Sequence, residues 1–175
     1  MGKHKPHIGT GLLGSQWRMR VLSDNGRADV AYHLAQQTNY PSWGYMTEND
    51  ATTIWELWNG DTGDPSMNSH NHVMLLGDLI TWFYEYLGGI KLSQSMPTVD
   101  MGNIIKLQPF VLGDLEWAKT AYQSRFGMIK SEWEIKNGDF YWRVSIPPNT
   151  FAMLTFPNGG EPEHLSEEMP FYEEK

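Results

Sequence analysis

The residues best suited to chemistry lie in one short stretch, Ala51–Gly60, where Glu56 stands between Trp55 and Trp58. The stretch follows a loop-like run, Pro41–Tyr45, that carries another tryptophan. Aromatic faces can bind the apolar faces of sugar rings, and a carboxylate among them can take a proton from water. The pattern therefore predicts a sugar-handling site with Glu56 as a base. Two core indoles beside a solvated surface acid would give the same pattern, and this alternative stays open.

Two pairs of side chains could in principle bind a metal ion. His70 and His72 are two residues apart, but further ligands at a suitable spacing are missing. Asp61 and Asp64 lie among glycine and proline, which is more typical of a turn than of a calcium loop. We therefore expect no metal and no other cofactor.

Composition limits the classes of partner. The net charge of the 175-residue chain is -8, and no segment concentrates Lys and Arg, which argues against nucleic acid. No apolar run approaches the length of a membrane span, and the polar start of the sequence does not resemble a signal peptide. Without cysteine the chain has no disulfide or thiol chemistry.

Apolar spacing predicts helices in the first half of the chain. The first spans about 12–22 and ends at Asn25-Gly26, and the second covers 28–35, so a short connection makes them a helical hairpin. Residues 41–70 read as a long connection, which in a compact domain is usually functional. A third helix, 73–87, ends at Gly88-Gly89.

The second half has the alternation of β-strands. Strands are expected at 104–107 and 150–156, and two alternating runs, 130–136 and 140–146, flank Asn137-Gly138 as in a hairpin. The predicted fold class is α+β. We divide the chain into a helical part at 1–89, a β-sandwich-like part at 90–158 and an acidic tail at 159–175.

Several motifs together resemble the C-terminal portion of the bacterial α-L-rhamnosidases, which are inverting glycosidases with a six-hairpin (α/α)6 barrel. The resemblance covers roughly residues 8–156. The residues that carry it are Asn25-Gly26-Arg27, Tyr40–Met46, Ala51–Trp58, Asn71-His72, Ile104–Pro109, Gly113–Ala118 and Ser131-Glu132-Trp133.

The resemblance implies the last helices of the barrel followed by a small antiparallel β-sandwich. It also implies that Glu56 is the general base that activates water, and that His72 contacts the rhamnose. Trp43 and Trp58 are then candidates for the pocket wall. The substrate would be an α-L-rhamnoside. As an alternative, His72 is simply a helix-start histidine bonded to its own backbone.

The sequence departs from the family in its helix count. A six-hairpin barrel needs about twelve helices, and this chain offers about three. The family's general acid lies in an upstream barrel segment that has no counterpart here. We therefore expect a fragment that needs this upstream barrel as its partner and is inactive alone.

Two rival functions remain. One is a non-catalytic carbohydrate-binding module, which exposed aromatic residues on one sheet face would favour. The alternation of Trp133 and Ile135, and of Trp142 and Val144, instead indicates a buried sandwich core. The other rival is a six-hairpin glycosidase that acts on a different sugar.

Overall fold

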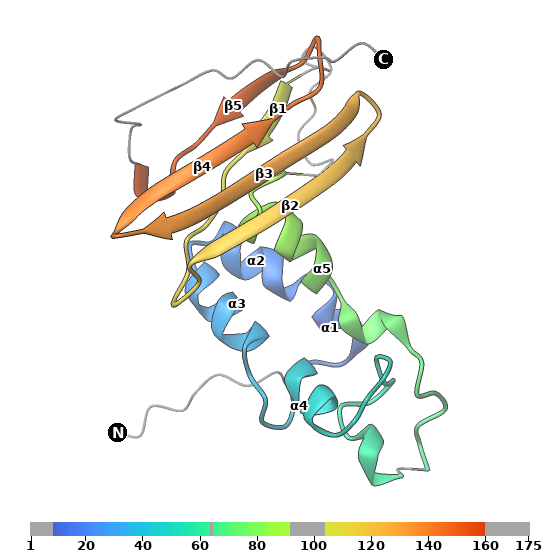
Figure 1. Cartoon of the computed structure of the whole chain (residues 1–175). Helices are drawn as coiled ribbons and strands as arrows, with labels where there is room; N and C mark the ends of the chain where they lie inside the picture. Colours follow the sequence, from blue (N-terminus) through green and yellow to red (C-terminus); the bar gives the residue numbers. More distant parts are fainter. Residues whose placement is uncertain (1–8, 64, 92–103, 160–175) are drawn as a thin grey trace.

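The protein folds as a helical part joined to a β part (Figure 1). The computed structural model describes residues 9–63, 65–91 and 104–159. Residues 160–175 of the predicted tail, and Asp64, lie outside these residues. No helix in the described ranges is both long and apolar enough to cross a membrane. The helical segments are α1 (Leu12–Ser15), α2 (Arg18–Asp24), α3 (Ala28–Ala35), α4 (Trp43–Glu48), η1 (Gly60–Thr62), η2 (Val73–Leu76), α5 (Leu79–Trp82), η3 (Phe83–Leu87) and η4 (Pro157–Gly159).

The predicted helical hairpin is confirmed, with one interruption. The first expected helix is divided at Gln16-Trp17 into α1 and α2, whereas α3 has the predicted bounds. The chain leaves α2 at the expected position, where Gly26 has a positive φ of 73°. Across this turn α2 and α3 lie side by side (Figure 1).

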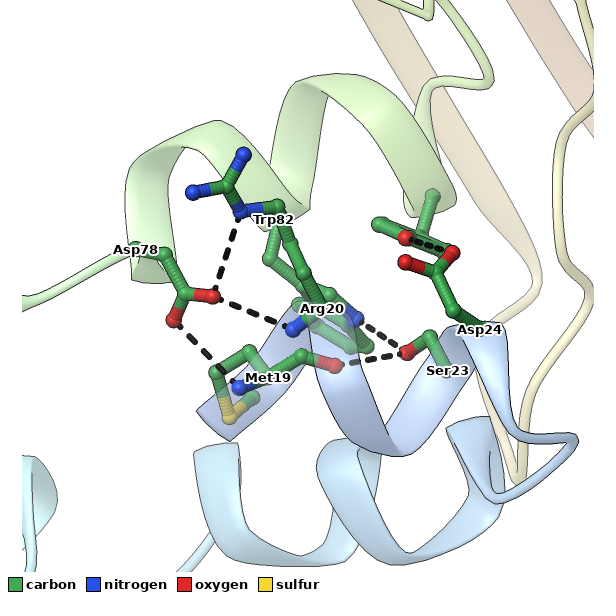
Figure 2. A network of polar contacts seen from close by, with 7 residues as sticks. Met19, Arg20, Ser23, Asp24, Asp78 and Trp82 are labelled. Atoms are coloured by element: carbon green, nitrogen blue, oxygen red, sulfur yellow. Dashed lines mark hydrogen bonds and ion pairs between the residues drawn. The ribbon is translucent and has the colours of Figure 1, made fainter. Parts of the chain in front are cut away.

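A network of buried polar groups joins α2 to α5 (Figure 2). The carboxylate of Asp78, just before α5, accepts hydrogen bonds from the backbone N–H groups of Met19 and Arg20 at 3.4 and 3.1 Å. The indole of Trp82 donates to the hydroxyl of Ser23 at 2.7 Å, and this hydroxyl donates to the Met19 carbonyl. Asp78 thereby satisfies N–H groups that an α-helix leaves free in its first turn.

The prediction of one continuous helix over 73–87 is wrong. The segment contains η2, then α5, and ends as the π-helix η3. The break lies at Gly77, which has φ 64° and ψ -135°. A Cβ atom at Gly77 would collide with the Ser15 carbonyl, so glycine lets this backbone pass close to α1.

The β part contains two sheets. β2 (Trp117–Ser124), β3 (Gly127–Lys136) and β4 (Asp139–Ser145) form an antiparallel sheet, and β1 (Ile104–Leu107) pairs in parallel with β5 (Phe151–Leu154). The hairpin at Asn137-Gly138 is confirmed, with positive φ at both residues. The sequence did not reveal β2, and the parallel pairing of β1 with β5 differs from the all-antiparallel expectation.

The two sheets share a small core. Leu107 of β1 and Ile129 of β3 are buried together with Ile90, and Trp142 and Val144 of β4 pack against them. As the alternation indicated, Trp133 also points inward and is 1% exposed.

Trp133 also joins the β part to the helical part. Its indole N–H donates to the Leu87 carbonyl at 2.7 Å. Gly88 approaches Thr120 of β2 so closely that a Cβ would collide with it. The end of η3 is therefore held firmly against the inner face of the three-stranded sheet.

Candidate active site

The predicted site lies in the loops next to α4. The segment 41–70, which the sequence predicted to be an irregular connection, contains this helix. The helix begins after Ser42, and the Ser42 hydroxyl accepts a hydrogen bond from the Tyr45 N–H at 2.9 Å. Farther along, the Tyr45 hydroxyl donates to the Asp61 carboxylate at 2.9 Å. These contacts attach the loop after Trp58 to the helix.

Both candidate wall residues are buried. Trp43 and Trp58 pack edge to face, with ring centroids 5.7 Å apart. The Trp43 indole donates to the Leu75 carbonyl, and the Trp58 indole donates to the Thr10 carbonyl, each at 3.0 Å. Both rings are therefore packed in the interior, where their hydrogen bonds hold α4 and the segment around Trp58 in place. Contact of either ring with a sugar stays a prediction.

Two separate stretches of chain lie side by side at the site. The Glu56 N–H donates to the Ser69 carbonyl at 3.1 Å, and the His72 N–H donates to the Ile54 carbonyl at 2.6 Å. Trp55 points inward between them and is 5% exposed, with Gly60 against its ring. This pairing carries Glu56 and His72 on facing segments.

The Glu56 carboxylate is held by specific donors instead of being merely solvated. Its Oε2 accepts the backbone N–H groups of Asn68 at 2.6 Å and Ser69 at 3.1 Å, while Oε1 accepts the Asn68 side-chain amide at 3.4 Å. These hydrogen bonds, the Asn68 N–H first, lower the pKa of Glu56 below its usual value, and His72 contributes a smaller electrostatic effect in the same direction.

The arrangement keeps Glu56 in the unprotonated form that a base requires, while the same hydrogen bonds make it a weaker base than a free glutamate. A lowered pKa keeps Glu56 ionised at and below neutral pH, and the side chain is only partly covered. Because Oε2 carries both backbone hydrogen bonds, Oε1 is the oxygen better placed to accept a proton from a water molecule. Sequence reasoning missed Asn68 and Ser69, since nothing in their spacing shows that they lie across from Glu56.

The histidines lie in different surroundings. His72 is partly buried beside the Glu56 stretch, whereas the exposed His70 ring contacts Trp55 and the Gly60 carbonyl. Among the described residues, no three His, Cys, Asp or Glu side chains come together as a metal site would require.

Comparison with known sequences matches nearly the whole chain. Residues 1–87 match the bacterial alpha-L-rhamnosidase 6 hairpin glycosidase domain, and residues 104–169 match the bacterial alpha-L-rhamnosidase C-terminal domain. An alpha-L-rhamnosidase of Streptomyces avermitilis is 34% identical over 156 residues, and one of Formosa agariphila is 35% identical. Each alignment covers 86% of this chain but only 15% and 16% of the relative, so the chain spans about a sixth of their length.

Solved structures agree. The alpha-L-rhamnosidase from Dictyoglumus thermophilum superposes with a TM-score of 0.76 at 33% identity, covering 89% of this chain and 17% of that one. The Streptomyces avermitilis enzyme, solved in complex with L-rhamnose, gives a TM-score of 0.74 at 34% identity, covering 85% of this chain and 14% of that one.

Proposed function

We propose that this chain, which belongs to the bacterial α-L-rhamnosidase family, supplies the general base for hydrolysis of terminal α-L-rhamnosyl residues. Glu56 is this base. The observation that carries the proposal is the set of three N–H donors on the Glu56 carboxylate, which favour its ionised form. A base has to be ionised before it can take a proton from water.

The proposed reaction is hydrolysis with inversion. Such a reaction uses a second carboxyl group, an acid that protonates the leaving oxygen, roughly 6.5–9.5 Å from the base so that a water molecule fits between them. We propose, from the family resemblance, that this acid comes from a barrel segment outside the present sequence. We therefore propose that the chain acts as one part of a longer catalytic barrel and does not turn over substrate by itself.

His72 and the two tryptophans complete the proposed site. His72 lies on the segment facing Glu56, where its imidazole can hydrogen-bond to rhamnose hydroxyls. Trp43 and Trp58 are only 7% and 9% exposed, and we propose that they contribute to the pocket wall next to Glu56. The rhamnose complex of the Streptomyces avermitilis enzyme supports rhamnose as the sugar recognised by this family.

The proposal is tested in a chimera. The matching 156 residues of the Streptomyces avermitilis enzyme are replaced by those of this chain, and release of phenol from an aryl α-L-rhamnoside is measured. We expect turnover, and we expect Glu56→Gln to reduce kcat by about 10²–10⁴-fold while L-rhamnose still binds. Glu48→Gln, an exposed carboxylate at the end of α4, is the matched control and keeps full activity.

Two results would contradict the proposal. If Glu56→Gln keeps the kcat of the parent chimera, Glu56 is not the base. If the chimera cleaves an aryl glucoside faster than the rhamnoside, the pocket recognises another sugar.

A further inference from the structure

The outer face of the three-stranded sheet carries an ordered row of side chains. Trp117 of β2 lies opposite Glu134 of β3, which lies opposite Tyr141 of β4. Residues opposite one another in an antiparallel sheet point to the same face, and neighbouring strands are 4.7–4.9 Å apart. The two aromatic residues therefore stand about 10 Å apart on either side of a carboxylate.

This face is open to solvent. Trp117 is 60% exposed and Tyr141 is 52% exposed. The other face of the sheet carries Ile129, Trp142 and Val144, which pack with Ile90 and with Leu107 of β1. In the described residues nothing therefore covers the row. Exposed aromatic residues, which would favour a sugar-binding module, are therefore present on one face of the sheet. The sequence did not predict this face because it did not predict β2.

Polar groups surround the two rings. The Glu134 carboxylate pairs with the Lys136 ammonium at 2.6 Å, and Lys136 lies 6.0 Å from the centre of the Tyr141 ring. The next row of the same face has charges of both signs, in Lys119, Glu132 and Arg143. Charged residues are depleted from the centres of protein interfaces, and a mixed-sign surface does not attract a polyanion such as nucleic acid.

We propose that this outer face binds a pyranosyl oligosaccharide as a second sugar site, distinct from the loop that holds Glu56. Trp117 and Tyr141 stack on the apolar faces of two sugar units. Glu134, between them, accepts hydrogen bonds from sugar hydroxyls. The choice of rhamnose-containing glycans as ligands rests on the function proposed above, whereas the stacking chemistry does not.

The test is an NMR titration of the chain with methyl α-L-rhamnopyranoside and with an oligosaccharide ending in α-L-rhamnosyl residues. We expect the indole N–H signal of Trp117 to shift. Trp117→Ala and Tyr141→Ala each weaken oligosaccharide binding at least fivefold, while Tyr141→Phe, which keeps the ring, binds as the parent does. Trp17→Ala removes an equally exposed indole from the helical part and leaves the affinity unchanged.

The outcomes separate the two proposals. The Trp117 shift persists in Glu56→Gln, because the two sites are separate. Unchanged affinity in Trp117→Ala and Tyr141→Ala, or no shift at any sugar concentration, would overturn the second site and leave Glu56 unaffected. A Trp117 shift that depends on protein concentration without sugar would mean that another copy covers this face, and would also overturn it.

Discussion

Replacing Asp78 tests whether one buried carboxylate holds the helical part together. Asp78 is 4% exposed and accepts the N–H groups of Met19 and Arg20, together with the Arg20 guanidinium at 3.4 Å. Asp78→Ala leaves two backbone donors and one charged group without their acceptor. Each unsatisfied buried donor costs about 1–3 kcal/mol, and water entering the space left by the side chain recovers part of this. We expect a loss of about 3 kcal/mol in the free energy of unfolding.

Asp78→Asn refines the estimate. Burial raises the pKa of Asp78 above its usual value in spite of its hydrogen bonds. The free-energy cost of removing water from the charge therefore exceeds the stabilisation of the charge by its hydrogen-bond donors. An asparagine keeps an acceptor oxygen without a charge, and we expect it to cost less than alanine. As the pH falls through the raised pKa, the folded state binds a proton before the unfolded state does. The Asp78 contribution to the unfolding free energy therefore increases on acidification and is lost as the pH rises again, and Asp78→Asn removes this dependence.

Urea unfolding followed by tryptophan fluorescence measures both effects. With a slope of about 2–3 kcal/mol per molar urea, Asp78→Ala lowers the midpoint by about 1 M. Asp29→Ala is the matched control, because it breaks an Arg–Asp pair whose two side chains are both more than half exposed, and such pairs contribute about 0–1 kcal/mol. If Asp78→Ala costs no more than Asp29→Ala, the account of the buried network is wrong.

Two further predictions concern Glu56 and Gly77. Asn68→Ala removes the side-chain amide that donates to Glu56, and Asn68→Pro removes both this amide and the backbone N–H, so the pKa of Glu56 rises in that order. An NMR titration of the Glu56 carboxyl carbon measures the pKa. Equal pKa values in the parent and the two variants would contradict the assignment. Gly77→Ala lowers the free energy of unfolding in urea by about 3 kcal/mol, because the backbone conformation is one that glycine alone adopts readily and the added Cβ meets a carbonyl. Gly63→Ala has the same φ of 64° with open space around it and costs about 1 kcal/mol, and similar losses at both positions would refute the steric argument.

The sequence predicted the fold best where local chemistry decides it. The Asn137-Gly138 turn and the turn at Gly26 between α2 and α3 follow from short-range signals. The prediction of a continuous helix over 73–87 failed because apolar spacing contains no information about the close approach to α1 that Gly77 permits. β2 was missed because two of its inward residues, Ala118 and Thr120, are small and weaken the apolar alternation, and Thr120 lies close to Gly88.

The candidate site was predictable in its central residue but not in its surroundings. Glu56 stood out through the two tryptophans beside it. Their indoles turned out to be buried, while the groups that set the pKa of Glu56 are backbone N–H groups at Asn68 and Ser69. A backbone donor has no signature in sequence, because every residue except proline carries one.

The parallel pairing of β1 with β5 has a consequence for the order of folding. Ile104 pairs with Phe151, and all of β2, β3 and β4 lie between them along the chain. The hairpins of the three-stranded sheet involve only nearby residues, so they can form while synthesis continues. Leu107, in contrast, gains its neighbour Leu154 only after nearly the whole β part has left the ribosome. Pairing of β5 is therefore a late step, whereas the small core consists of residues that precede β5 and can pack before it arrives.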